Sequence, residues 1–142
     1  MIRFLEHTAI DLLKWEQCLD RAENGIVYAR PWYLNRVCPG WAALVLDDYT
    51  AVMPLPVRRK MGISYIYLPH YIQQLGLFGN RPHTLNTLAF INAIPSRYRL
   101  IDMKLNEGNS VSGNSFTASH KHNYLLDMSQ GTEATRIQYN RN

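Results

Sequence analysis

The stretch from Trp41 to Gly79 constrains the fold of this chain more than any other part of it. It opens with a near-continuous apolar run, Trp41–Leu46, which predicts a buried strand. Tyr49–Val57 predicts a second strand that should be irregular or lie at an edge, because its two prolines cannot donate to a ladder. Ile63–Leu68 predicts a third strand, since β-branched and aromatic residues dominate it. The stretch therefore predicts a sheet at the core.

Helical signals precede this sheet. Ile2–Glu6 alternates apolar and polar residues and predicts a short first strand. The stripe of apolar residues over Ala9–Ala22 predicts a helix, with Thr8 as its N-cap and Asn24-Gly25 as a left-handed end. Pro31 suits the first position of a second, short helix. Two helices should thus lie between the first strand and the main sheet.

The second half of the chain alternates between element types. Pro82–Ile94 predicts a third helix, and Tyr98–Leu105 predicts another strand. Asn106–Ser115 is rich in Gly, Asn and Ser and predicts a loop, followed by extended Phe116–Met128 and a last helix from Gly131 or Thr132. Strands in a meander, then a strand–helix–strand crossover, predict an α/β (α+β) fold. Its sheet should be mixed, mainly antiparallel and flanked by helices.

Composition limits the class of protein. The chain has 142 residues, enough for one domain with a sizeable core, and its formal net charge of +4 is compatible with an anionic ligand. Cys18 and Cys38 make neither a disulfide framework nor a metal site, and they indicate a reducing, cytoplasmic location. Charges interrupt the apolar N-terminus, so it is no signal peptide, and no apolar run is long enough for a membrane span.

Two segments carry a resemblance to a known family. Asn24–Val37 (NGIVYARPWYLNRV) and Tyr124–Asn142 (YLLDMSQGTEATRIQYNRN), together with the order of elements, resemble the GNAT (acyl-CoA N-acyltransferase) superfamily and its Fem-like branch. The resemblance covers nearly the whole chain as one GNAT-like domain, residues 1–142. Fem-like proteins contain two such domains in tandem, and TEATRIQYNRN stops without a helix-ending signal. We therefore expect this chain to be the N-terminal half of a longer two-domain protein.

The resemblance implies transfer of an acyl or aminoacyl group to an amine. Acyl-CoA or aminoacyl-tRNA would be the co-substrate of the full-length protein, and no cofactor is expected in this half. The implied partners are a second GNAT-like domain of the same chain and a small amine or a cell-wall precursor as acceptor. This half would mainly shape the acceptor site. The alternative is a non-catalytic GNAT-like binding or structural module that has lost its CoA loop.

The GNAT pyrophosphate loop has a degenerate counterpart here. GNAT proteins bind the pyrophosphate of acyl-CoA on backbone N–H groups of a glycine loop before a helix. The equivalent residues are Gln73, Gln74, Gly76 and Gly79, but Phe78 stands where a small residue is needed and Gly79 comes one residue late. The second near-match, Arg59–Ser64, lies in a predicted hairpin. We expect a loop that has lost its contact with CoA.

Aromatic residues give the candidate acceptor site. The resemblance places Arg30, Trp32 and Tyr33 beside the acceptor, and Tyr71 raises the same possibility from the third strand. His70 is a candidate general base, with Tyr67 as a second catalytic candidate, although no partner for either is evident. The other interpretation of these aromatic residues is ordinary core packing.

Two further patterns carry alternatives. Arg58-Arg59-Lys60 predicts a basic turn that either contacts phosphate or the acceptor stem of a tRNA, or is only a solvated hairpin tip. His120 and His122 share a strand face if the strand forms, but a zinc site needs a third ligand. No metal site is expected.

Overall fold

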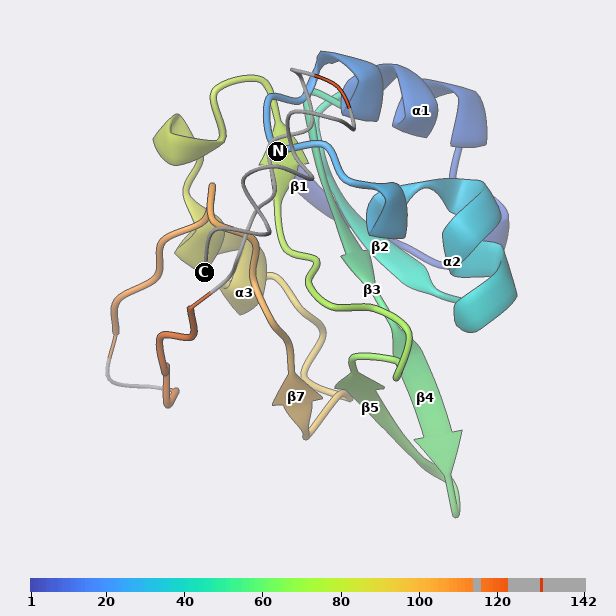
Figure 1. Ribbon diagram of the computed structural model, residues 1–142. Helices are drawn as coiled ribbons and strands as arrows, with labels where there is room; N and C mark the ends of the chain where they lie inside the picture. Colours follow the sequence, from blue (N-terminus) through green and yellow to red (C-terminus); the bar gives the residue numbers. More distant parts are fainter. Residues whose placement is uncertain (114–115, 123–130, 132–142) are drawn as a thin grey trace. The chain divides into compact units, whose positions relative to one another are not determined.

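Figure 1 shows the computed structural model, which describes residues 1–113, 116–122 and 131. The chain divides into two compact units, Met1–Ser112 and Gly113–Asn142. Every helix and strand of the described residues lies in the first unit, and described residues of the second unit have no regular element. The predicted last helix, and most of Tyr124–Asn142, lie outside the described residues.

A four-stranded antiparallel sheet forms the centre of the first unit. Its strands are β1 (Ile2–Leu5), β2 (Ala42–Leu46), β3 (Ala51–Leu55) and β6 (Phe78–Gly79), in the order β1-β2-β3-β6. The predicted apolar strand is β2, which pairs on both sides and is buried along nearly its whole length. Burial on both faces explains why its sequence does not alternate.

The predicted second strand, Tyr49–Val57, contains Pro54 and Pro56 and is divided between two sheets. Pro54 lies within β3 opposite Ala43 of β2, and β6 pairs only with Ala51 and Val52. Pro54 therefore sits where β3 has a neighbour on one side only, as a residue without an N–H requires. Pro56 then separates β3 from β4.

A three-stranded sheet follows, made of β4 (Val57–Lys60), β5 (Ile63–Tyr67) and β7 (Ile101–Asp102), in that order. β4 and β5 are antiparallel, whereas β5 and β7 are parallel and are connected through helix α3 (Thr87–Asn92). This crossover confirms the α+β class with mixed pairing. The single sheet expected from the sequence is instead two sheets, because the chain changes sheets at Pro56.

The basic residues after Pro56 lie on a strand and not in a turn. Arg58, Arg59 and Lys60 belong to β4, and the turn is formed by Met61 and Gly62 alone. Both turn residues have positive φ, 50° and 79°, which is the signature of a type I′ hairpin. A two-residue turn leaves no room for basic residues within it.

Two helices cover one face of the central sheet, α1 (Leu12–Arg21) and α2 (Pro31–Val37). Asp11, and not Thr8, caps α1, because its carboxylate accepts the backbone N–H groups of Leu13 and Lys14. Thr8 lies in a 3-10 turn, His7–Ala9. Pro31 opens α2 as predicted.

The predicted left-handed end of α1 is wrong. The helix ends at Arg21 and Ala22 is extended, while neither Asn24 nor Gly25 has positive φ. Gly25 is required for space, because a Cβ there would lie 2.8 Å from the carbonyl oxygen of Leu19. A second 3-10 turn, Val27–Ala29, then leads into α2.

The predicted third helix and the strand after it are both shorter than expected. Pro82–Thr84 forms a 3-10 turn, Leu85 is extended, and Asn86 caps α3 through the N–H of Ala89. Only Ile101 and Asp102 pair with β5, because β5 ends before Pro69, which has no N–H. Beyond that break, Leu75 and Leu105 form an isolated parallel bridge.

Both faces of β2 and β3 are buried in hydrophobic clusters. Alternation along β2 places Ala43 and Val45 against α1 and α2, with Trp15 and Trp41. Leu44 and Met53 face the other way and pack with Phe90 of α3. This two-sided core fixes α1 and α2 relative to the strands. No helix within the described residues is long and apolar enough to cross a membrane.

Candidate functional site

Five aromatic side chains on two segments form one surface cluster. The ring of Tyr33 packs edge-on against Tyr28 and Trp32, with 5.5 Å between ring centroids in both pairs. The Tyr33 hydroxyl donates to the carbonyl oxygen of Tyr71 at 2.6 Å, and the His70 ring lies 5.5 Å from the Tyr71 ring. We call Tyr28, Trp32, Tyr33, His70 and Tyr71 the aromatic cluster.

Local structure explains how the cluster forms. Helix α2 buries Pro31 and Leu34, which leaves Trp32 pointing outward and Tyr33 half-buried at the edge. On the other segment, the N–H of Ile72 bonds to the carbonyl of Pro69 and closes a turn that places His70 and Tyr71 at the surface. The exposed fractions of Trp32 and Tyr71 are 62% and 73%, so ligands can reach both rings.

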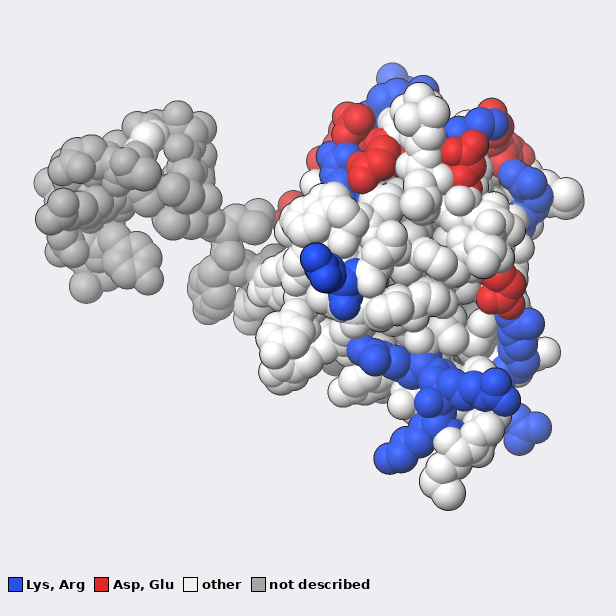
Figure 2. Space-filling model, turned by 90° about the vertical axis from the view of Figure 1, so that its right-hand side faces the viewer, with Lys and Arg blue, Asp and Glu red and all other residues white. Residues whose placement is uncertain are grey.

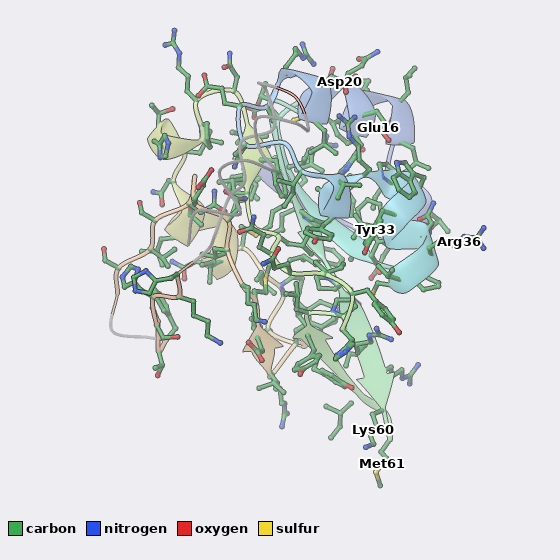
Figure 3. The ribbon with its side chains drawn as sticks, in the orientation of Figure 1. Glu16, Asp20, Tyr33, Arg36, Lys60 and Met61 are labelled. Carbon is green, nitrogen blue, oxygen red and sulfur yellow. The ribbon has the colours of Figure 1, made fainter. Side chains whose placement is uncertain are left out.

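Arg30 does not belong to the cluster's open surface. Its Nη1 pairs with the carboxylates of Glu16 and Asp20, one turn apart on α1, and the Asp20 contact is 2.6 Å. These hydrogen bonds, Glu16 first, raise the pKa of the Arg30 guanidinium. Figure 3 shows Glu16 and Asp20 on α1 above Tyr33 and Arg36 of α2. Arg30 therefore ties α1 to the start of α2, and its contact with an acceptor stays a prediction.

The glycine loop is held by asparagine side chains. The N–H of Leu77 donates to Asn109 Oδ1 at 2.7 Å, and the N–H of Leu75 donates to the carbonyl of Lys104. The carbonyl of Leu77 accepts from the side-chain amides of Asn24 and Asn109. Two backbone N–H groups of the loop, those of Leu75 and Leu77, therefore already have acceptors inside the protein.

Gly76 and Gly79 serve packing in this arrangement. Gly76 has φ of 109°, and a Cβ there would lie 2.1 Å from Asn109 Oδ1. Gly79 belongs to β6, between Leu85 and Ala51. Gln73 is exposed and Gln74 half-exposed just before this buried segment. Phe78 is fully buried, so it fills core and not a ligand site. Helix α3 begins only at Thr87, well beyond the loop.

The remaining candidates belong to other segments of the chain. Tyr67 is on β5, on the same face as Tyr65, and 48% of it is exposed. His120 and His122 are exposed and in no strand. No group of three metal-ligating side chains occurs among the residues that the structure describes.

Sequence reasoning did not find the role of Asn24, Asn106 and Asn109. Asn24 was assigned to a helix end, and the other two lie in a predicted loop. Their amides instead reach Leu75, Leu77 and each other, as in the 2.9 Å contact from Asn24 to Asn106. A recurrence of Asn in a Gly-rich segment is the only signal, and it is typical of ordinary loops as well.

Cys18 and Cys38 are both free and buried. Burial raises the pKa of the Cys18 thiol to about 11, and it raises the pKa of Cys38 in the same direction. Since the thiolate is the reactive form, both thiols should be poor nucleophiles near neutral pH.

We therefore expect native protein at pH 8 to react with iodoacetamide far more slowly than unfolded protein, and expect the Cys18 rate to rise only toward pH 11. The neutral thiols also favour the folded state below their unfolded pKa, about 8.5. That stabilisation is lost as pH rises through the folded values. Mass spectrometry of the label on each cysteine, as a function of pH, measures the two labelling rates. Equal labelling of native and urea-unfolded protein at pH 8 would contradict the expected difference.

Comparison with known proteins gives no significant match: no family model, curated protein or solved structure matches the chain.

Proposed function

We propose that this chain is the acceptor-binding half of a Fem-like N-acyltransferase of the GNAT superfamily, working with a second GNAT-like domain. The observation that carries the proposal is the aromatic cluster. It joins three of the four residues expected at the acceptor site, Trp32, Tyr33 and Tyr71, with the candidate general base His70, across two segments that are far apart in sequence. The α+β order with a parallel β5–β7 pair around α3 also supports the GNAT assignment.

Aromatic surface suits an amine acceptor. A protonated amine is attracted to the faces of Trp and Tyr rings, and the exposed rings of Trp32 and Tyr71 offer such faces. In the proposed reaction the neutral amine nitrogen attacks the carbonyl carbon of a thioester or ester. The new C–N bond forms, the C–S or C–O bond breaks, and the leaving thiolate or alkoxide receives a proton. His70 is the proposed base that removes the proton from the amine.

The donor is proposed to bind mainly on the second domain. The internal hydrogen bonds of Leu75 and Leu77 support this division, because they use two backbone amides of the glycine loop. The same observation favours the second candidate, a binding module of this fold without catalysis. The donor would be acyl-CoA or aminoacyl-tRNA, and two free buried thiols fit a cytoplasmic location.

Trp32 gives a direct test of acceptor binding. Trp15 and Trp41 are fully buried, so acrylamide quenching of tryptophan fluorescence reports mainly on Trp32. Glucosamine and Nα-acetyl-lysine amide should protect Trp32 from acrylamide, whereas their N-acetylated forms, which carry no ammonium group, should protect it far less. Acetyl-CoA should not protect it. Equal protection by the amines and their acetylated forms would refute the acceptor site.

Replacing Tyr71 with alanine should weaken amine binding about five- to tenfold, since it removes one ring face worth about 1 kcal/mol. Tyr33→Phe should have a smaller effect, because it removes only the hydroxyl bond to Tyr71. The control is Leu13→Ala, which changes an exposed side chain of α1. Calorimetry with glucosamine measures all three. Unchanged affinity in Tyr71→Ala would place the amine elsewhere.

A further inference from the structure

The β4–β5 hairpin ends in an exposed apolar tip. Met61 is 92% exposed and Ile63 is 60% exposed, and Figure 3 shows Met61 and Lys60 at the far end of the hairpin. Lys60 and Ile63 are directly opposite in the ladder and therefore share one face of the sheet. Among the described residues, the most exposed apolar side chain is thus carried on a projecting hairpin.

Folding does not account for methionine at this place. Met61 occupies the first position of a type I′ turn with φ of 50°, where Asn, Asp or Gly is strongly preferred. A Met there carries backbone strain and, at 92% exposure, has almost no packing within its own chain. Neither the turn preference nor packing among the described residues explains the methionine.

Cations surround the base of the tip. Arg58, Arg59 and Lys60 are consecutive on β4, and Arg36 is on the neighbouring α2. Arg58 Nη2 donates to the carbonyl of Val37 at the end of α2, at 3.4 Å, which ties the hairpin base to that helix. Within the described part of the chain, the side chains of Arg36, Arg59 and Lys60 have neither an ion pair nor a hydrogen bond.

The hairpin end of the first unit carries basic side chains without acidic neighbours on the face shown in Figure 2. Figure 2 shows Lys and Arg side chains gathered at the end where the hairpin projects, with uncharged atoms beyond them, and no Asp or Glu side chain on that end in this view. The acidic residue of the same sheet, Asp102, lies opposite Tyr67 at the other end of β5. On this face, an anionic surface would therefore meet cations and no acidic side chain near the tip.

We propose that the β4–β5 hairpin is a peripheral anchor for an anionic lipid surface. Met61 and Ile63 enter the boundary between headgroups and acyl chains, and Arg58, Arg59, Lys60 and Arg36 contact the lipid phosphates. The apolar tip would lie deepest, among the acyl chains, and the cations behind it would lie at the depth of the headgroup phosphates. RNA would use the cations alone, since phosphate contacts dominate its binding and need no exposed methionine. The anchor is independent of the proposed acyl transfer.

Met61→Asn is the decisive variant because folding and anchoring respond to it in opposite directions. Asn suits the type I′ turn, so thermal stability should stay the same or rise. Partition of the full chain onto vesicles of phosphatidylcholine with one quarter phosphatidylglycerol should fall about tenfold, since one apolar side chain no longer leaves water. Flotation measures the partition. The control Leu13→Gln, an exposed apolar residue on α1, should leave it unchanged.

Charge reversal tests the second half of the proposal. Lys60→Glu should lower partition at least about fivefold and should do so only on vesicles that contain phosphatidylglycerol. Arg21→Glu, the same reversal on α1, should have little effect. The fluorescence emission of a polarity-sensitive dye attached to Met61→Cys should shift to the blue when vesicles are added. The emission of the same dye attached to Leu13→Cys should not shift.

Two results would overturn the anchor. One is vesicle partition that is equal in Met61→Asn and the wild type. The other is absence of vesicle binding together with a gel shift of tRNA that Lys60→Glu abolishes and Met61→Asn does not, which would assign the hairpin to RNA.

Discussion

Trp15→Ala is expected to lower the free energy of unfolding by about 3–5 kcal/mol, because it empties a large volume in the centre of the core. Trp15 is fully buried, and its ring packs edge-on against Trp41 with 4.7 Å between centroids. Its indole N–H also donates to the carbonyl of Ala29 at 3.0 Å, and alanine would leave that carbonyl without this donor. For a chain of this length, the loss is a large part of the total stability.

Urea denaturation followed by circular dichroism measures this loss, and Trp32→Ala is the matched control. Both variants remove an indole, but Trp32 is 62% exposed on α2, so its removal should cost less than about 1 kcal/mol. The buried Trp15 connects α1 to the 3-10 turn before α2, and thus supports the segment that carries Tyr28 and Tyr33. Similar urea midpoints for the two variants would contradict this description of the core.

Elements with local signals were predicted well from the sequence. The apolar run of β2, the stripe of α1 and Pro31 at the start of α2 each depend on neighbouring residues only. The crossover between β5 and β7 was also predicted, since it follows from element order. Errors occurred where distant contacts decide: Pro82–Ile94 is broken at Leu85, whose side chain packs into the core.

In the candidate site, too, features that depend on neighbouring residues were predicted and features that depend on distant contacts were not. Trp32 and Tyr33 are adjacent in sequence, whereas Tyr71 was a candidate without a visible link to them. The structure supplies that link as a hydrogen bond across 38 positions. Arg30 looked like a ligand contact, since nothing local shows that Glu16 and Asp20 face it. The sequence does not predict that Met61 is exposed. Whether a residue between basic and apolar neighbours is buried or projects depends on the geometry of the turn. Side-chain partners distant in sequence were thus the main information that the sequence lacked.

Asn106→Ala is expected to cost about 2–3 kcal/mol and to loosen the glycine loop. The side chain is buried, with 3% exposed, and its amide donates to the carbonyl of Leu75 at 2.9 Å. Its Oδ1 accepts from the N–H of Gly108 and from the amide of Asn24, each at 2.9 Å. Alanine leaves buried donors without this acceptor, and each such loss costs about 1–3 kcal/mol. The exposed Asn80→Ala should be within about 0.5 kcal/mol of the wild type.

Asn106→Asp separates hydrogen bonding from shape. The carboxylate keeps the acceptor for Gly108 but turns a negative oxygen toward the carbonyl of Leu75, so burial and repulsion raise its pKa in the folded state. When the pKa of the new carboxyl is higher in the folded state, the variant keeps its stability below the pKa of the unfolded state, about 3.9. It loses that stability as pH rises through the pKa of the folded state. Relative to the wild type at the same pH, Asn106→Asp should therefore recover stability on acidification, whereas Asn106→Ala should not.

Hydrogen exchange at the Leu77 amide measures the opening of the loop directly. Faster exchange is expected in both variants at pH 7. Exchange as slow as in the wild type would show that the loop is held without Asn106.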